Sequence, residues 1–277
     1  ISACLVGSEM CIRDSATTRA PVVNPPAVVA PTRRTDVAQR LAGTPGARIP
    51  RVFMLPRAAL AAADAAEQLA RSGLRFPLLL RSPGFHTGQH FFRVDHPLML
   101  RAALGQLPGD ELLAIEYVDT RGPDGRVRKY RVMFIGGRLY PLHLAISSNW
   151  KVHYFSADMA ANAQNRAEDL RFLADMHAVI GDRALATLQR IADTLGLDYG
   201  GIDFGMDAAG DVVLFEANAT MTVPPPAAEE RWLYRRAAVN HINAAVSQML
   251  LERARAFVTE RERASAGTGL DVAQPRR

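Results

Sequence analysis

One stretch of the chain constrains its fold more than any other. Residues Gly200–Thr220 read GGIDFGMDAAGDVVLFEANAT. Two apolar segments, Gly201–Met206 and Val212–Phe215, flank an acidic turn that contains a glycine, Asp207–Asp211. Short apolar runs separated by a turn of this chemistry predict a β-hairpin. We therefore expect two paired strands near the C-terminal third of the chain.

Three oxygen-bearing side chains lie on this hairpin. Asp203 is in the first strand, and Glu216 and Asn218 end the second. Glu216 and Asn218 are two residues apart, so an extended chain projects them to the same face, and the hairpin folds Asp203 back beside them. Two carboxylates and an amide suit Mg²⁺, which takes hard oxygen ligands together with phosphate oxygens. The alternative is a surface hairpin whose acidic residues keep a sheet edge soluble.

A second segment has features of a phosphate-binding loop. The apolar run Phe76–Arg81 ends on a basic residue, and a turn-rich loop, Ser82–Gln89, follows it. Gly84 and Gly88 in this loop carry no Cβ, so backbone N–H groups there can approach phosphate oxygens closely. The same pattern is also typical of an ordinary hairpin loop.

A second hairpin, Arg126–Ser147, carries several cations. Arg128, Lys129 and Arg131 lie on its first strand, where they either face a bound anion or, for Arg128 and Lys129, simply form a solvated strand face. The segment WKVHY follows. In it Lys151 and His153 alternate with a valine, so they share a face. Lys151 is a candidate for binding phosphate or an acidic substrate, and His153 for orienting or exchanging a proton near neutral pH. The alternative for this segment is an amphipathic strand or loop.

The hairpin at 200–220 resembles the metal-binding signature of the ATP-grasp superfamily. In that signature an acidic residue on one strand and a Glu-x-Asn on the next hold the ions of MgATP, and Asp203, Glu216 and Asn218 fall on those positions. Over residues 20–250 the sequence is most similar to glutathione synthetase-like and ribosomal protein S6 modification-type ligases. Gly201 departs from the pattern, because peptide-forming members commonly have an arginine there. An oxyanion stabiliser would then come from Arg131 or Lys151.

The resemblance implies an α+β ATP-grasp fold, with two α+β lobes that bind the nucleotide between antiparallel sheets. It implies ATP and Mg²⁺ as cofactors, with the metal on Asp203, Glu216 and Asn218. The other implied site residues are Arg81, Gly84 and Gly88 for the triphosphate, Glu116, Tyr117 and Val118 at the hinge strand for adenine and ribose, and Arg131 and Lys151 for charge stabilisation during transfer.

The implied activity is ATP-dependent ligation of a carboxylate to an amine or similar nucleophile through an acyl-phosphate. The partners would be a small-molecule or peptide carboxylate and an amine co-substrate. Two alternatives stay open. One is a kinase-like phosphotransferase, and the other is a regulatory module that binds MgATP without turnover.

Charge and cysteine content limit the partners and the compartment. The net charge of +5 is modest, and the arginines of the chain form no run with interleaved aromatic residues. Binding to nucleic acid is therefore not expected. No apolar stretch reaches the ~20 residues of a membrane helix. Both cysteines, Cys4 and Cys11, lie in the first fifteen residues. The rest of the chain has no cysteine and so no disulfide, which fits a reducing cytoplasm.

We expect five segments along the chain. Residues 1–15 have the character of a non-native, adaptor-like sequence, and 16–47 that of a linker or the remnant of a preceding domain. An upstream Rossmann-like or helical-repeat domain is a possible further partner. The small lobe would span 48–118, the large lobe 119–263, and a disordered tail 264–277. Periodicity predicts helices at 56–72, near 97–105, 162–178 and 182–196, and over 229–263.

Overall fold

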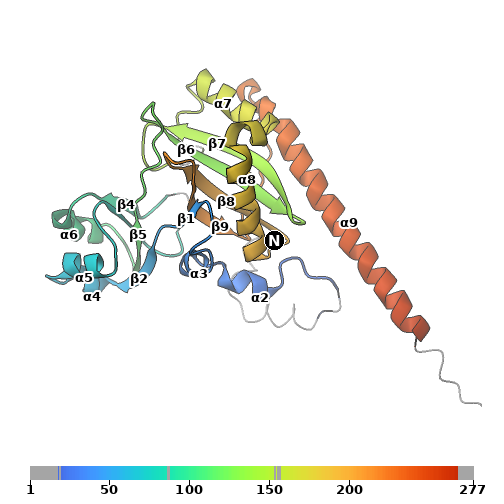
Figure 1. The fold of residues 1–277 in the computed structure, drawn as a ribbon, viewed down its shortest axis with the longest axis horizontal. Coiled ribbons are helices and arrows are strands. Elements are labelled where there is room, and N and C mark those ends of the chain that lie inside the picture. The colour runs from blue at the N-terminus through green and yellow to red at the C-terminus, as the bar shows by residue number, and fades with distance from the viewer. Residues whose placement is uncertain (1–17, 19, 86–87, 153, 155–156, 268–277) are drawn as a thin grey trace, which may run out of the picture.

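The computed structural model describes residues 18, 20–85, 88–152, 154 and 157–267, so the segment expected to be non-native and residues 268–277 lie outside the described part. Two separate β-sheets, each with its own helices and its own apolar core, make up the fold (Figure 1). The predicted α+β architecture with two sheets is confirmed.

The smaller sheet has the strand order β2-β5-β3-β4. Its strands are β2 (Val52–Pro56), β5 (Glu111–Glu116), β3 (Leu78–Arg81) and β4 (Phe91–Val94), and all neighbours are antiparallel. Its helices are α4 (Arg57–Ala61), α5 (Ala65–Arg71) and α6 (Leu100–Leu104), the last preceded by a 3₁₀ turn, η2 (Pro97–Met99). Leucines from these strands and helices form one buried core.

The single helix predicted over 56–72 is wrong, because the chain breaks it into α4 and α5. Ala62 adopts an extended conformation, with ψ of 152°, and α5 starts after Asp64. Leu60 and Leu69 are each 2% exposed in the same core. In a straight helix of about 3.6 residues per turn these two positions point to opposite sides. The break turns both toward the sheet.

The larger sheet has the strand order β1-β9-β8-β6-β7. Its strands are β1 (Ala47–Arg48), β9 (Val212–Asn218), β8 (Tyr199–Met206), β6 (Val127–Ile135) and β7 (Arg138–Ser147). Both predicted hairpins are present as β6–β7 and β8–β9. The short strand β1 pairs in parallel with β9 at Val212 and Val213. It gives β9 a neighbour on each side at that end.

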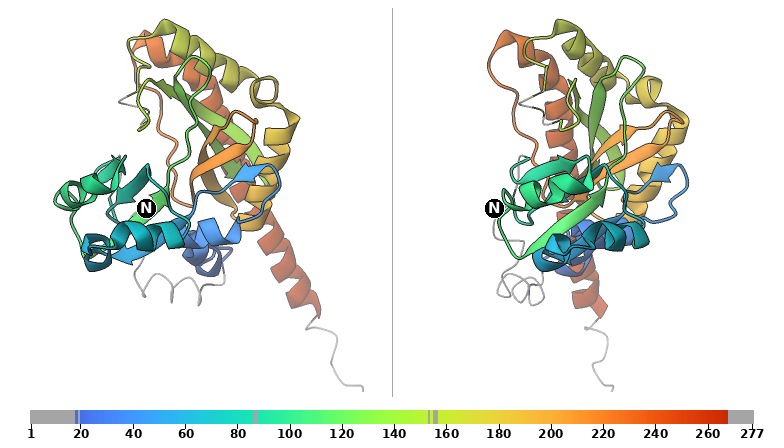
Figure 2. Two further views of the ribbon diagram at one scale, coloured as in Figure 1. Left: turned by 60° about the vertical axis from the view of Figure 1, so that its left-hand side comes forward. Right: turned by 90° about the vertical axis from the view of Figure 1, so that its left-hand side faces the viewer.

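Helices cover both faces of the larger sheet (Figures 1 and 2). One face packs on α7 (Ala163–Ala174) and α8 (Met176–Leu195), with Tyr130, Phe134 and Phe204 in the shared core. Asp175 separates the two helices, and its side chain caps α8 by accepting from the Ala178 N–H. The chain kinks again at Gly181, with φ of 76°, where we expected the boundary between the helices.

The opposite face packs on α9 (Arg236–Gly267), which follows a 3₁₀ segment, η4 (Glu230–Arg235). Met133, Ile135, Val239 and Ile242 form the contact. The C-terminal half of α9 extends away from the body of the molecule (Figure 1). Before β1, the chain forms α2 (Pro26–Val29), a 3₁₀ turn η1 (Ala30–Thr32) and α3 (Arg34–Arg40). No helix in the described part is long and apolar enough to span a membrane.

Candidate functional site

A row of four polar residues crosses the larger sheet, one on each of four adjacent strands. His143 on β7 pairs with Arg131 on β6, Arg131 with Asp203 on β8, and Asp203 with Glu216 on β9. The register shifts at two points in this row, next to Arg131 and next to Asp203. Such bulges re-aim side chains and are common beside functional sites. We call these four residues the cross-sheet row.

Asp203 is the most buried acid of the row, at 3% exposed. Its carboxylate accepts from Lys129 Nζ at 3.0 Å, and from Arg131 Nε at 2.5 Å and Nη2 at 2.8 Å. Burial alone would raise the pKa of this carboxyl, but Lys129 and Arg131 outweigh that effect and hold it well below its usual range. Asp203 is therefore a charged carboxylate inside the sheet, which is not the soluble edge of the alternative interpretation.

Glu216 and Asn218 lie beside Asp203, as the hairpin predicted. The Asn218 side-chain amide donates to Glu216 Oε1 at 3.2 Å, and Arg34 Nη2 lies 3.0 Å from the same oxygen. Among the described residues Glu216 Oε2 has no partner. The amide oxygen of Asn218 accepts from the backbone N–H of Thr220 at 2.9 Å.

The donor set fits a hard cation in its chemistry. Two carboxylates face each other across β8 and β9, an amide is adjacent, and one carboxylate oxygen is available. Within the described ranges no group of three or more His, Cys, Asp or Glu side chains could hold a metal, so phosphate oxygens would have to complete the coordination of a Mg²⁺ ion here. The metal assignment of these three residues remains a prediction.

Positive charge is in excess around the two carboxylates. Lys129, Arg131 and Arg34 contact them directly, and Arg81 interacts electrostatically with Arg34 and Glu216. Burial lowers the pKa of Arg81, and the positive Arg34 lowers it further while Glu216 opposes them. Four cations against two carboxylates make a site suited to a polyanion.

The expected phosphate loop lies at the edge of the smaller sheet that carries β3 and β4. Arg81 ends β3, donates to the Phe85 carbonyl, and lies 5.6 Å from the Phe91 ring centre. Gly84 and Gly88 have φ of 79° and 74°, a region that favours glycine. The two residues at 86–87 lie outside the described part. Both glycines therefore adopt a backbone conformation that other residues rarely take.

Lys151 connects this loop to the larger sheet. Its Nζ donates to the carbonyls of Gly88 at 3.3 Å and Phe91 at 3.4 Å. The neighbouring Trp150 makes an edge contact with Phe91 at 5.3 Å between ring centres, and with Tyr117 at 6.5 Å. Lys151, placed after β7, thus reaches the loop after β3. His153 lies outside the described residues.

The three hinge residues are not equally free to bind a ligand. Glu116 ends β5, where Arg48 Nη2 lies 3.4 Å from its Oε1 and the Arg51 N–H donates to its Oε2 at 3.2 Å. Tyr117 and Val118 lie just beyond the strand. The Tyr117 hydroxyl accepts a long bond from Arg93 at 3.5 Å, and Val118 is buried. Their nucleotide role remains a prediction.

Gly201 has no room for the arginine that is common at this position in peptide-forming ligases. A Cβ there would lie 2.7 Å from Met221 Sδ, 3.0 Å from Met133 Sδ and 3.1 Å from the Val132 carbonyl oxygen. Two methionines fill the space. Any cation for an oxyanion must therefore come from another position.

Sequence reasoning missed two residues of the site. Arg34 lies in the segment expected to be a domain remnant, yet it binds Glu216 and the Phe215 carbonyl. His143 is 4% exposed on β7 and completes the cross-sheet row. The alternation of β7 could have placed His143 on the same face as Arg131, whereas no local signal links Arg34 to β9.

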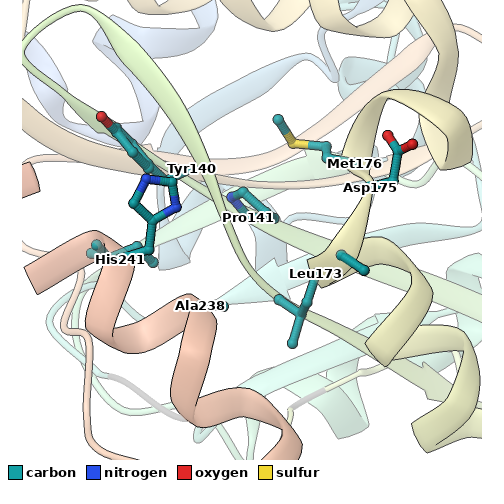
Figure 3. A pocket seen from close by; sticks show the side chains of 9 residues that line it. Tyr140, Pro141, Leu173, Asp175, Met176, Ala238 and His241 are labelled. Carbon is teal, nitrogen blue, oxygen red and sulfur yellow. The ribbon is translucent and has the colours of Figure 1, made fainter.

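A separate cavity of about 240 Å³ lies away from the cross-sheet row. Tyr140 and Pro141 on β7, Leu173 to Met176 at the α7–α8 junction, and Ala238, His241 and Ile242 on α9 form its walls (Figure 3). Tyr140 and His241 meet edge to face at 5.1 Å, and the Asp175 carboxylate is used in capping α8. None of the predicted site residues borders this cavity.

Comparisons with known proteins give likeness in fold only. No protein-family model and no curated protein matches the sequence. The D-alanine–D-alanine ligase from Coxiella burnetii is 12% identical with a TM-score of 0.48, covering 91% of this chain and 64% of that one. The VanG D-Ala:D-Ser ligase from Enterococcus faecalis is 15% identical with a TM-score of 0.47, and the match covers 86% of this chain and 64% of that one.

A third solved structure, D-alanyl-alanine synthetase A from Vibrio cholerae O1 biovar eltor, is 12% identical. Its TM-score is 0.50, and the match covers 83% of this chain and 68% of that one. The chain thus spans just under two thirds of the length of the first two ligases. The fold likeness rests on the third.

Proposed function

Because this chain has the ATP-grasp fold, we propose that it is an ATP-dependent ligase that joins a carboxylate to an amine or a similar nucleophile. The observation that carries the proposal is the set of Asp203, Glu216 and Asn218 side by side on β8 and β9, with Arg131 paired to Asp203. Hard oxygens next to fixed cations are what phosphoryl transfer requires.

The chain's own residues divide the work as follows. Asp203, Glu216 and Asn218 would hold Mg²⁺, which would supply neutralisation of phosphate charge when bound. Arg81 and the loop containing Gly84 and Gly88 orient the triphosphate between the two sheets. The role of the hinge strand is to hold the adenine and ribose through Glu116, Tyr117 and Val118.

Arg131 and Lys151 supply positive charge where it is needed during transfer. Arg131 is fixed by two bonds to Asp203, so it needs no reorganisation when charge develops. Lys151 contacts carbonyls of the loop and can turn to phosphate at small cost. In the overall reaction ATP phosphorylates the acid, and the amine then displaces phosphate from the resulting acyl-phosphate and loses a proton.

Two other functions use the same residues. A kinase-like enzyme would stop after phosphoryl transfer, and a regulatory module would bind MgATP without turnover. The excess of cations around Asp203 and Glu216 favours catalysis over sensing, because binding alone does not need a cation fixed against the metal ligand. We further propose that the chain acts in the cytoplasm on a small-molecule or peptide acid, without nucleic acid or membrane.

The test is thermal unfolding with a non-hydrolysable ATP analogue, with and without Mg²⁺. Ligand at 100 times its dissociation constant should stabilise the fold by ~2.7 kcal/mol. The increase should require Mg²⁺ and disappear in Glu216→Gln, which keeps the shape of the side chain. Glu260→Gln, an exposed change on α9, is the matched control and should respond as the wild type does. Stabilisation that is equal without Mg²⁺, or that persists in Glu216→Gln, would overturn the metal assignment.

A further inference from the structure

A second cation, Arg235, is buried near the cross-sheet row. It ends η4 and is 6% exposed. Its guanidinium stacks 4.3 Å from the Tyr154 ring centre, and its Nη2 donates a long hydrogen bond to the Leu142 carbonyl at 3.4 Å. Its Nε is buried with no hydrogen-bond partner. No carboxylate of the described chain forms an ion pair with it. A buried cation in this state is costly unless an anion joins it.

Asp169 interacts electrostatically with Arg235 but is already committed to other partners. Its Oδ1 accepts from the Leu144 N–H at 2.7 Å and its Oδ2 from the Tyr234 hydroxyl at 2.6 Å. Burial raises the pKa of this carboxyl to about 6, so the surroundings do not favour its charge. Asp169 thus influences Arg235 electrostatically but forms no ion pair with its guanidinium.

His143 interacts electrostatically with both Arg235 and Arg131. Its ring is 4.6 Å from the Tyr154 ring on which Arg235 stacks, and it pairs with Arg131 across β6 and β7. Burial lowers the pKa of His143 well below its ordinary value, and Arg131 adds to the effect. The imidazole is therefore neutral, and its Nδ1 is buried with no partner. A neutral ring with an unused nitrogen thus lies near both guanidinium groups.

From this arrangement we propose that the acid substrate carries a second carboxylate, and that Arg235, with His143 Nδ1, binds it. This inference rests on the proposed function, in which Arg131 and the metal ligands take the carboxylate that is phosphorylated. The two guanidinium groups then hold the two ends of one acid. Arg131 and Lys129 keep 23% and 12% of their side chains exposed, so the ligand would enter from the side of these two residues. The substrate class is a dicarboxylic acid.

The probes are glutarate, which has two carboxylates, and butyrate, which has one on a similar carbon chain. Calorimetric titration of the wild type, saturated with Mg²⁺ and a non-hydrolysable ATP analogue, should give a dissociation constant at least tenfold lower for glutarate. Arg235→Met should abolish the difference between the two acids. Arg236→Met, which changes the exposed neighbour, should preserve it. Equal binding of the two acids by the wild type, or an unchanged preference in Arg235→Met, would overturn the proposal.

A second variant tests the proposal if Arg235→Met does not fold. Arg235→Lys keeps the charge and should retain part of the glutarate preference even if Arg235→Met folds poorly. The comparison of the two acids in the wild type needs no variant. If the wild type does not bind the nucleotide, the proposed ligase function fails, whereas the glutarate preference measured without nucleotide still decides the subsite.

Discussion

Arg131 and Asp203 face each other across β6 and β8, with Nε 2.5 Å from Oδ1 and Nη2 2.8 Å from Oδ2. Lys129 adds a third contact to the same carboxylate. The carboxylate of this pair is almost fully buried, since only 4% of the Asp203 side chain is exposed to solvent. Removing one member of such a buried cluster leaves the other charges without compensation.

Asp203→Asn should therefore lower the free energy of unfolding by about 3–5 kcal/mol. The change keeps the shape of the side chain but leaves Lys129 and Arg131 facing a neutral amide. Urea denaturation measures the loss. Glu216→Gln is the internal comparison and should cost much less, because 33% of the Glu216 side chain is exposed. A cost below about 1 kcal/mol for Asp203→Asn would mean that the cluster contributes little to folding.

Asp169 should make stability depend on pH. Burial raises its pKa from 3.8 to about 6. Well below pH 3.8 the carboxyl is protonated in both the folded and the unfolded states. As pH rises toward and through 6, the unfolded chain releases the proton first and the folded state loses stability, on the order of 3 kcal/mol in all.

Asp169→Asn cannot titrate, so its stability relative to the wild type should rise by about 1 kcal/mol between pH 5 and 7.5. Urea titrations at the two pH values measure the difference. Asp193→Asn, an exposed change on α8, should show no such trend. A constant difference between Asp169→Asn and the wild type would show that the pKa of Asp169 is not raised.

Lys151→Met should weaken binding of the ATP analogue about 10- to 100-fold, the range expected for losing a hydrogen bond to a charged group. The melting temperature without ligand should hardly change, because Lys151 is exposed and its bonds to the Gly88 and Phe91 carbonyls are long. Calorimetry gives the affinity. Arg138→Met removes another exposed cation and should leave affinity unchanged. Equal losses in both variants would point to general electrostatics.

Gly201→Ala should destabilise the fold by about 1–3 kcal/mol, the usual cost of overpacking. The methionine sulfur atoms can shift, but the Val132 carbonyl oxygen at 3.1 Å belongs to the backbone of β6. Gly105→Ala is the control, since a Cβ there meets nothing closer than 3.5 Å. Thermal unfolding compares the two, and equal melting temperatures would mean that the sheet accommodates the methyl group.

The sequence predicted those parts of the fold and site that are encoded locally. The β8–β9 hairpin follows from its turn and from alternation, so the neighbourhood of Asp203, Glu216 and Asn218 could be anticipated. The break between α4 and α5 depends on where the small sheet lies relative to Leu60 and Leu69, and helix periodicity carries no such information.

Long-range contacts were the other gap. Arg34 reaches Glu216 only because α3 packs beside β9, and these segments are far apart in the chain. The proposed role of His143 depends on its proximity to Arg131 on the next strand and to Arg235 on η4. A lone histidine in an apolar strand gives no hint of either neighbour.

The two residues of β1 have a consequence beyond their length. Since β9 is held by β8 on one side and by β1 on the other at Val212 and Val213, it is not free to slide. A slip of one residue would turn Glu216 and Asn218 to the apolar face under α8. Ala47 and Arg48 therefore help to fix the register of β9. A segment far from Glu216 in sequence thus helps to determine the direction of the Glu216 side chain.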